Sequence, residues 1–387
     1  MAQTLPEAIL VDHVLAQAAL PPSAATRKRF AQALLDWFTA GWSGMQMPLA
    51  CRYRELALKA FGPPGISPVF GGPGLAPLGA GFANAAIAHL REIDDAHRPA
   101  MLHPGVVAIS PVLALAANGS LTRRQALDAV VAGYEVALRI GECLGGRHAG
   151  AFHATATAGC VGAAAATAVA LGLPRDALHH AMGHAATQSA GLLQLVDDGA
   201  HEAKSLHPGF AVRNGMMAAW AAQAGLPAAR AFVTGGRGLY ALLAGDGPAE
   251  ALHVGLDAPP RLHTTTIKAW PSCAMTFTPL DALQALLAEH RFAAEDVASI
   301  EVHIFSHALK IAGVDWPAKP SETPFSLRYL LAALVHHGRL GIEETERPVL
   351  DDPALVALGA RVRVTPCEDF QALFPGRRPP QVTVLLA

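Results

Sequence analysis

The chain has 387 residues, of which 52% are hydrophobic and 16% are charged, and its formal net charge is −2. A chain of this length can bury a large core and favours two domains over one. The near-neutral charge gives no reason to expect a nucleic-acid partner or an anionic membrane surface as a partner. The five cysteines are scattered and form no CxxC pair. This pattern indicates the reduced thiols of a cytoplasmic protein and argues against a zinc ribbon or a disulfide framework.

Helical spacing recurs along the first part of the chain, over residues 5–19, 26–39, 80–93, 106–117 and 122–145. The first twenty residues do not read as a signal peptide, because they lack a basic start and because Glu7 and Asp12 interrupt their apolar face. Residues 61–77 are rich in glycine and proline, which predicts an irregular connection between helices.

Residues 154–173 form an uncharged run that consists mostly of alanine and glycine. The run is long enough to span a bilayer, but alanine is close to neutral on insertion scales. We therefore predict a helix that other helices surround on all sides. His153 precedes this helix, and Lys204 follows it further along the chain. A lysine near such a core needs an anionic partner, which makes Lys204 a candidate for holding a negatively charged ligand.

Two more helices follow, over residues 174–193 with Pro174 at the first helical position and over residues 205–224. The composition changes within residues 245–260, where glycine, proline and alanine dominate, and beyond that point the periodicity changes as well. Strands are predicted over residues 261–270, 298–307, 360–366 and 379–387, with helices over residues 279–290 and 324–336.

The expected fold class is mainly α. A large all-helical domain is predicted over residues 1–257, and a smaller α+β lid domain over residues 258–387.

One group of polar residues lies on a single predicted loop and contains Glu92, Asp94, Asp95, His97 and His103. Carboxylates and imidazoles that lie close together shift each other's pKa values, which general acid–base catalysis uses. The alternative is an ordinary helix end followed by a solvated loop.

Further candidates lie at element ends. His153 stands at a helix start, where exposed N–H groups favour anions, although a packing histidine is an equal alternative. Lys204 and His207 lie together in KSLHPG, where a surface lysine is the alternative. Lys268 ends a predicted strand, where a solvated lysine is commoner, and Tyr329 taken alone reads as a core residue.

We predict no metal site. His180 and His184 have the i, i+4 spacing that can bind zinc, but the sequence offers no third ligand near them.

The chain resembles the MmgE/PrpD family in four motifs that occur in the family's order. They are ANAAIAHLREIDDAHRPAMLHPG, FHATATAGCVGAAAATAVALGL, KSLHPGFAVRNGMMAAWAAQAG and IKAWPSCA. The resemblance implies a large helical domain with a smaller lid, an active site between them, and a homodimer. It also implies a small di- or tricarboxylate substrate and reactions that need no cofactor.

Carried over by position, the resemblance assigns site roles to individual residues. Glu92 stands at the first aspartate of the family's Asp-aromatic-Asp-Asp run, and Asp94 and Asp95 match its last two. The matches to the family's site histidines, lysines and tyrosine are His103, His153, Lys204, Lys268 and Tyr329. The resemblance thus implies that two imidazoles act as base and acid and that two ammonium groups stabilise a carbanion beside a carboxylate.

Family frequency favours a dehydratase of the 2-methylcitrate type. The alternatives are a cis-aconitate decarboxylase, an iminodisuccinate epimerase and a non-catalytic relative that binds a carboxylate. Ala96 and Phe277 stand where a threonine and a histidine are common, and relatives continue past the last predicted strand. These departures favour the non-catalytic alternative.

Overall fold

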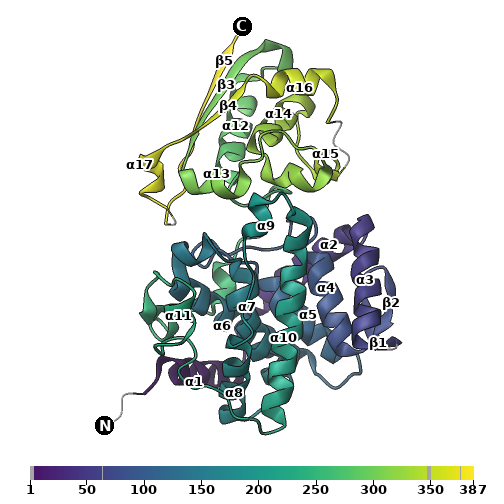
Figure 1. Ribbon diagram of the computed structural model, residues 1–387, viewed down its shortest axis with the longest axis vertical. Coiled ribbons are helices and arrows are strands. Elements are labelled where there is room, and N and C mark those ends of the chain that lie inside the picture. The colour runs from purple at the N-terminus through teal and green to yellow at the C-terminus, as the bar shows by residue number, and fades with distance from the viewer. Residues whose placement is uncertain (1–3, 63, 347–349, 375) are drawn as a thin grey trace. The chain divides into compact units, whose positions relative to one another are not determined.

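The computed structural model describes residues 4–62, 64–346, 350–374 and 376–387. The chain divides into two compact units (Figure 1). The first comprises Met1–Leu90 and Asp94–Ile267, and the second comprises Arg91–Ile93 and Lys268–Ala387. The division falls after Ile267, later in the chain than the domain boundary predicted after residue 257.

Helices form most of the first unit. In chain order they are α1 (Pro6–Ala19), α2 (Ala24–Gly44), α3 (Pro48–Phe61), α4 (Pro77–Ala88), α5 (Pro104–Ala116), α6 (Arg123–Ala149), α7 (Ala154–Ala170), α8 (Arg175–Ala186), α9 (Gln194–Asp197), α10 (Leu206–Gln223) and α11 (Leu239–Leu242). Short 3-10 turns are η1 (His201–Ser205), η2 (Ala249–Leu252) and η3 (Arg261–Thr264).

Helix α7 lies at the centre of this unit and packs against α5, α6, α8 and α10 (Figure 1). Every residue of α7 except Val169 is buried. The prediction of a helix surrounded by other helices is therefore confirmed. Small side chains permit the close approach, since a Cβ added at Gly162 would lie 2.6 Å from the Cβ of Ala137 on α6. Among the residues that the structure describes, no helix is long and apolar enough to cross a membrane.

The irregular connection predicted over residues 61–77 is wrong in part. The segment folds into an antiparallel hairpin of β1 (Pro64–Val69) and β2 (Gly72–Leu75), so the first unit contains a hairpin beside its helices. Its glycines serve the pairing: Gly71 has φ +66° in the turn, and a Cβ at Gly74 would lie 2.3 Å from the carbonyl oxygen of Gly65.

Three other boundaries differ from the sequence-based expectation. The helix predicted over residues 174–193 ends at Ala186, and Pro174 is its N-cap residue and not its first helical residue. Helix α4 ends at Ala88, so the acidic residues after it lie outside the helix.

The strand predicted over residues 261–270 is also wrong, because that segment begins with the 3-10 turn η3 and only Thr266 pairs with another segment, at Ala96. Side-chain hydrogen bonds compete with strand pairing there, since the hydroxyl of Thr265 donates to the Leu262 carbonyl oxygen over 2.9 Å.

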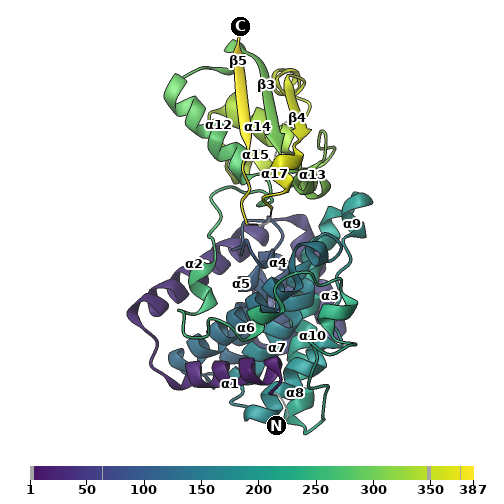
Figure 2. The same cartoon turned by 90° about the vertical axis from the view of Figure 1, so that its left-hand side faces the viewer.

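The second unit contains a three-stranded mixed sheet in the order β4-β3-β5 (Figure 2). Strand β3 (Val297–Ile304) runs parallel to β4 (Val362–Pro366) and antiparallel to β5 (Gln381–Leu386). Its helices and 3-10 turns are α12 (Phe277–His290), η4 (Ala294–Asp296), α13 (Ser306–Ala312), η5 (Pro320–Phe325), α14 (Leu327–His337), α15 (Ile342–Glu346), α16 (Pro353–Gly359) and α17 (Glu368–Gln371).

Alternation along β3 builds the core of the second unit. Ile300, Val302 and Ile304 are buried on one face of the strand, and they share a hydrophobic cluster with Leu330 and Leu334 of α14. A mainly helical protein with a small mixed sheet in its C-terminal part is thus the fold class that the sequence predicted.

Candidate active site

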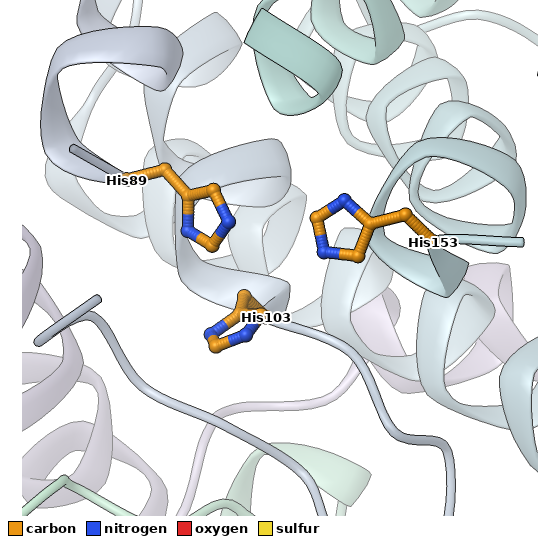
Figure 3. Close-up of side chains that lie close together, drawn as sticks. All are labelled: His89, His103 and His153. Atoms are coloured by element: carbon orange, nitrogen blue, oxygen red, sulfur yellow. The ribbon is translucent and has the colours of Figure 1, made fainter. Parts of the chain in front are cut away.

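Three histidines at helix ends meet in the first unit (Figure 3). His89 is the C-cap residue of α4, while His103 and His153 are the N-cap residues of α5 and α7. The ring centroid of His89 lies 4.7 Å from that of His103 and 5.4 Å from that of His153. The amino ends of α5 and α7 therefore lie beside the same group of side chains, and helix amino ends favour negative charge.

His89 lies at the centre of the group and is buried. Its Nδ1 lies 2.8 Å from Oδ2 of Asp94, and its Nε2 lies 3.0 Å from Nζ of Lys204. His89 lies within the motif ANAAIAHLREIDDAHRPAMLHPG but was not predicted as a site residue. The signal that could have identified it is a histidine at the end of an otherwise apolar helix, five residues before an aspartate.

Asp94 also contacts the second histidine. Its Oδ2 lies 3.4 Å from Nδ1 of His103. The same Nδ1 lies 3.0 Å from the carbonyl oxygen of Asp95, and because a carbonyl only accepts, Nδ1 of His103 carries the proton. The backbone N–H of His103 donates to Oγ1 of Thr155 over 3.0 Å, which ties the start of α5 to the start of α7. The side chain of His103 is 12% exposed, so it is the histidine of the three that solvent reaches most.

Asp95 fixes the loop that carries these groups. Its Oδ1 accepts from the N–H of Gly105 and its Oδ2 accepts from the hydroxyl of Tyr134, each over 2.8 Å. Its own N–H donates to Oδ2 of Asp36 over 2.8 Å. Burial raises the pKa of Asp95 to about 6, although the hydrogen bonds from Tyr134 and Gly105 act in the opposite direction. Both carboxylate oxygens of Asp95 thus accept hydrogen bonds from other groups of the protein. A contact between Asp95 and the substrate stays a prediction.

His153 and His207 form a neutral pair. Their Nδ1 atoms lie 3.1 Å apart, so one ring donates and the other accepts. Burial, assisted by the charge of Lys204, lowers the pKa of His153 well below its ordinary value and that of His207 to about 4. Nε2 of His153 is buried and has no hydrogen-bond partner in the part of the chain that the structure describes. A ring nitrogen of this kind is ready to contact a bound ligand.

Lys204 belongs to the 3-10 turn η1, which precedes α10. The lysine is buried, and the next residue, Ser205, shares a hydrogen bond with the hydroxyl of Tyr53 on α3. Residues from four separate segments of the first unit thus form one cluster, which we call the histidine–lysine cluster: His89, Asp94, His103, His153, Lys204 and His207.

His97 has a different surrounding. Its Nδ1 accepts from the N–H of Ala100 over 3.1 Å, and its Nε2 lies 2.9 Å from Oγ1 of Thr264. Burial and the charge of Arg261 lower its pKa to about 4. Its substrate-binding role stays a prediction.

Three candidates belong to the second unit. Nζ of Lys268 donates to the backbone oxygen of Glu92 and lies 3.4 Å from Oε2 of the same residue. Tyr329 is buried in the core of this unit, where its hydroxyl donates to the Glu344 carbonyl oxygen over 2.9 Å. The structure therefore pairs Glu92 with Lys268 and buries Tyr329 in the core of this unit, and the site roles of all three stay predictions.

The cluster suits an anion better than a metal ion. One ligand atom from each of His89, His103 and His153 lies within 4.8 Å of the other two. Zinc needs nitrogen atoms at about 2.0–2.1 Å and no nearby cation. Both ring nitrogens of His89 are engaged by protein groups, and one of these is the ammonium group of Lys204.

His180 and His184, which have a spacing that can bind zinc, both contact backbone atoms. Nδ1 of His180 accepts from the N–H of Ala228 over 3.1 Å, and Nε2 of His184 lies 3.1 Å from the carbonyl oxygen of Leu226.

The fold and the cluster define a mainly helical protein whose larger unit buries imidazoles, a carboxylate and an ammonium group together. The chain belongs to the MmgE/PrpD family: residues 9–251 match the MmgE/PrpD N-terminal domain, and residues 270–387 match the MmgE/PrpD C-terminal domain. The resemblance stated from the four motifs is thereby confirmed.

Two relatives are similar in sequence to part of this chain. A cis-aconitate decarboxylase from Aspergillus terreus is 30% identical over 269 residues, which are 65% of this chain and 54% of the relative. A cis-aconitate decarboxylase-like protein from Aspergillus oryzae is 30% identical over 205 residues, which are 50% of this chain and 41% of the relative. The matched segment thus spans about half of these relatives or less.

Proposed function

We propose that this chain is a cofactor-independent lyase that decarboxylates a small unsaturated tricarboxylate, with cis-aconitate as the first substrate to test. The histidine–lysine cluster supports this proposal most directly, because it combines a buried ammonium group with imidazoles in different surroundings. The names of the two relatives favour decarboxylation over the dehydration of 2-methylcitrate that family frequency suggested.

The reaction requires charge stabilisation and one proton. When carbon dioxide leaves, the C–C bond breaks and its electron pair moves into the carbon skeleton, where one proton must be added to carbon. The product is an unsaturated five-carbon dicarboxylate, and no electron donor or acceptor is needed. A cationic donor next to the developing negative charge lowers the barrier. Lys204 supplies this group in our proposal, and its ammonium also attracts the carboxylates of the substrate.

His103 is our candidate for the acid. Its Nδ1–H is directed to the carbonyl oxygen of Asp95, so proton exchange takes place at Nε2. The carboxylate of Asp94, 3.4 Å from the ring, places negative charge beside an imidazole that holds an extra proton. His103 is also the most exposed of the three histidines, which allows it to regain a proton after each turnover.

His153 has the opposite character. Its lowered pKa keeps the ring neutral, so it is a poor proton donor and is available for hydrogen bonds as an uncharged ring. We assign it to contacts with the substrate through Nε2. The same neutral ring would be the base if the reaction were a dehydration or an epimerisation.

The substrate proposal can be tested by incubating the protein in heavy water with cis-aconitate, 2-methylcitrate, citrate and iminodisuccinate. We expect carbon dioxide from cis-aconitate in equal amount to a five-carbon product that carries one carbon-bound deuterium, detected by NMR. Faster elimination of water from 2-methylcitrate would identify a dehydratase instead. Binding of these acids without turnover of any of them would identify the non-catalytic relative.

The residue assignment has its own test. We expect His103→Ala and Lys204→Met to lower kcat by about 100-fold or more, because each removes a group that acts on the reacting atoms. Lys59→Met removes an exposed lysine of α3 and serves as the control with unchanged activity. Retention of near wild-type turnover by both site variants would show that the cluster is not the active site.

The homodimer implied by the resemblance and the cytoplasmic location indicated by the cysteine pattern stay predictions.

A further inference from the structure

We infer that His89 is a positioning residue, which holds the ammonium group of Lys204 in place because Asp94 fixes the tautomer of its ring. This inference rests on the proposed function, because it concerns how the same cluster is arranged. It assigns a role to a histidine that neither the motif reading nor the family match singles out.

The imidazole of His89 is fixed in position by its helix. His89 directly follows α4, and every residue of α4 from Gly79 to Ala88 is buried. The side chain of Asn84 in the same helix donates to the Pro68 carbonyl oxygen and accepts from the N–H of Phe70, over 2.9 and 3.0 Å. These contacts hold α4, and with it the backbone that carries the ring of His89.

The hydrogen bonds of the ring run in one direction. An ionised carboxylate only accepts, so the 2.8 Å contact with Asp94 places the proton of His89 on Nδ1. In the neutral ring Nε2 is then an acceptor. An ammonium group only donates, which matches the 3.0 Å contact between Nζ of Lys204 and Nε2 of His89. In the opposite tautomer, two donors would face each other across this distance.

Lys204 needs such a partner to be useful. A lysine side chain is flexible and loses rotamer entropy when it is held. The backbone of η1 is fixed nearby through Ser205 and Tyr53, and the contact with His89 acts on the ammonium group of Lys204 itself. The contact with His89 selects one position for the ammonium group before a substrate arrives, which is preorganisation of the kind that electrostatic catalysis requires.

His89 acts through its neighbours and is not itself a candidate acid or base. Both of its ring nitrogens are engaged by Asp94 and Lys204, and its ring packs against His103 and His153. Because the side chain is inaccessible to solvent, its replacement by alanine leaves a space the size of an imidazole in the middle of the cluster.

Chemical rescue tests the inference directly. We expect His89→Ala to lower kcat about 10- to 100-fold, the range found when a partner that orients a functional group is lost. Added imidazole should raise the kcat of this variant at least tenfold, and the effect should saturate with imidazole concentration. The free molecule can donate to Asp94 and accept from Lys204 at the same time. Added 1-methylimidazole lacks the N–H group and should restore none of it. Equal rescue by both compounds, or rescue by neither in a folded variant, would overturn the inference.

Two further measurements separate positioning from a purely structural role. Asp94→Asn presents an amide that can donate to Nδ1 of His89, so we expect nitrogen-15 NMR of this variant to show His89 protonated at Nε2, a change that a purely structural role of His89 does not produce. Nitrogen-15 NMR of the wild-type protein labelled at histidine should show His89 protonated at Nδ1. A resonance that shows protonation at Nε2 in the wild-type protein contradicts the inference, even if the His89→Ala variant does not fold.

The NMR measurement also separates this inference from the proposed function. If no polycarboxylate is turned over, the proposed function fails, whereas the tautomer of His89 in the wild-type protein still supports or overturns the positioning role.

Discussion

His97 connects separate segments of the first unit through its ring. Nδ1 accepts from Ala100, and Nε2 donates to Thr264, since the lowered pKa of about 4 keeps the ring neutral with its proton on Nε2. Oε1 of Glu142 lies 3.7 Å from the same Nε2. A ring used in this way contributes to stability, and the contribution depends on pH.

We expect His97→Gln to change how stability responds to acid. The pKa of His97 is lower in the folded chain than the ordinary value of 6.5, so the unfolded chain binds the extra proton first as the pH falls. Wild-type stability should therefore fall from about pH 6.5 towards pH 4, by up to about 3 kcal/mol for this group. The variant has no histidine at this position and does not lose stability in this way. The difference in unfolding free energy between wild type and variant should therefore become smaller as the pH falls over the same window. Urea unfolding at pH 7.0, 5.5 and 4.5 measures the difference.

The matched control is His290→Gln, because the side chain of His290 is 56% exposed. This variant should keep the wild-type pH response. A disadvantage of His97→Gln that stays constant from pH 7 to pH 4.5 would contradict the prediction.

At the scale of elements, helix α7 owes its position to contacts that only glycine and alanine allow. A Cβ added at Gly215 of α10 would lie 2.7 Å from both the Cβ of Ala163 and the backbone nitrogen of Ala164 on α7. Gly133 of α6 is also close to α7, with 2.9 Å between an added Cβ and the Cβ of Ala166. His153 directly precedes α7, and Lys204 lies directly before α10. The positions of both side chains therefore depend on how closely α7 and α10 pack.

We expect Gly215→Ala to destabilise the protein. Alanine favours a helix over glycine by up to about 1 kcal/mol, but overpacking against α7 costs about 1–3 kcal/mol or more. The close contact is with backbone as well as side chain, so the loss should prevail. The midpoint of urea unfolding measures the sign. Gly236→Ala is the control, since an added Cβ there meets nothing within 4 Å and should change stability by less than about 0.5 kcal/mol. A Gly215→Ala variant as stable as this control would refute the packing argument.

On the scale of the whole molecule, the two compact units have cores of their own. The core of the second unit forms from β3, β4, α12, α14 and α16. Leu331 of α14 is fully buried in it, and Leu138 of α6 is fully buried in the first unit. We propose that the units unfold as two domains.

Calorimetry of matched variants tests this proposal. We expect two unfolding transitions. Leu331→Ala should lower the midpoint temperature of one transition, and Leu138→Ala that of the other. Each variant should lose about 2–5 kcal/mol of unfolding free energy in the affected domain. A single transition that both variants lower equally would show that the units unfold together.

Local patterns predicted much of the fold. Helical spacing located α1, α2, α5 and α6, and alternation located β3, β4 and β5, because the spacing of apolar side chains reports which face is buried. The uncharged alanine-rich run located α7, and helices were also predicted correctly at α10, α12 and α14. The same method failed at the hairpin of residues 64–75 and at residues 261–270. In the first, glycine and proline conceal a backbone pairing, and in the second, threonine-rich composition suggests a strand where side-chain hydrogen bonds form a turn.

By itself the sequence determined the mainly helical class, the alanine-rich central helix and the four family motifs. Each of these depends on the pattern of residues that are close together in the chain. Only the tertiary structure decided that Lys204 meets His89, 115 positions away in the chain, and that His153 meets His207. It also decided that His153 and His207 are neutral, because protonation depends on burial and on nearby charge. Which nitrogen of His89 accepts a hydrogen bond follows from the partners that the fold brings to its ring, and no local pattern contains them.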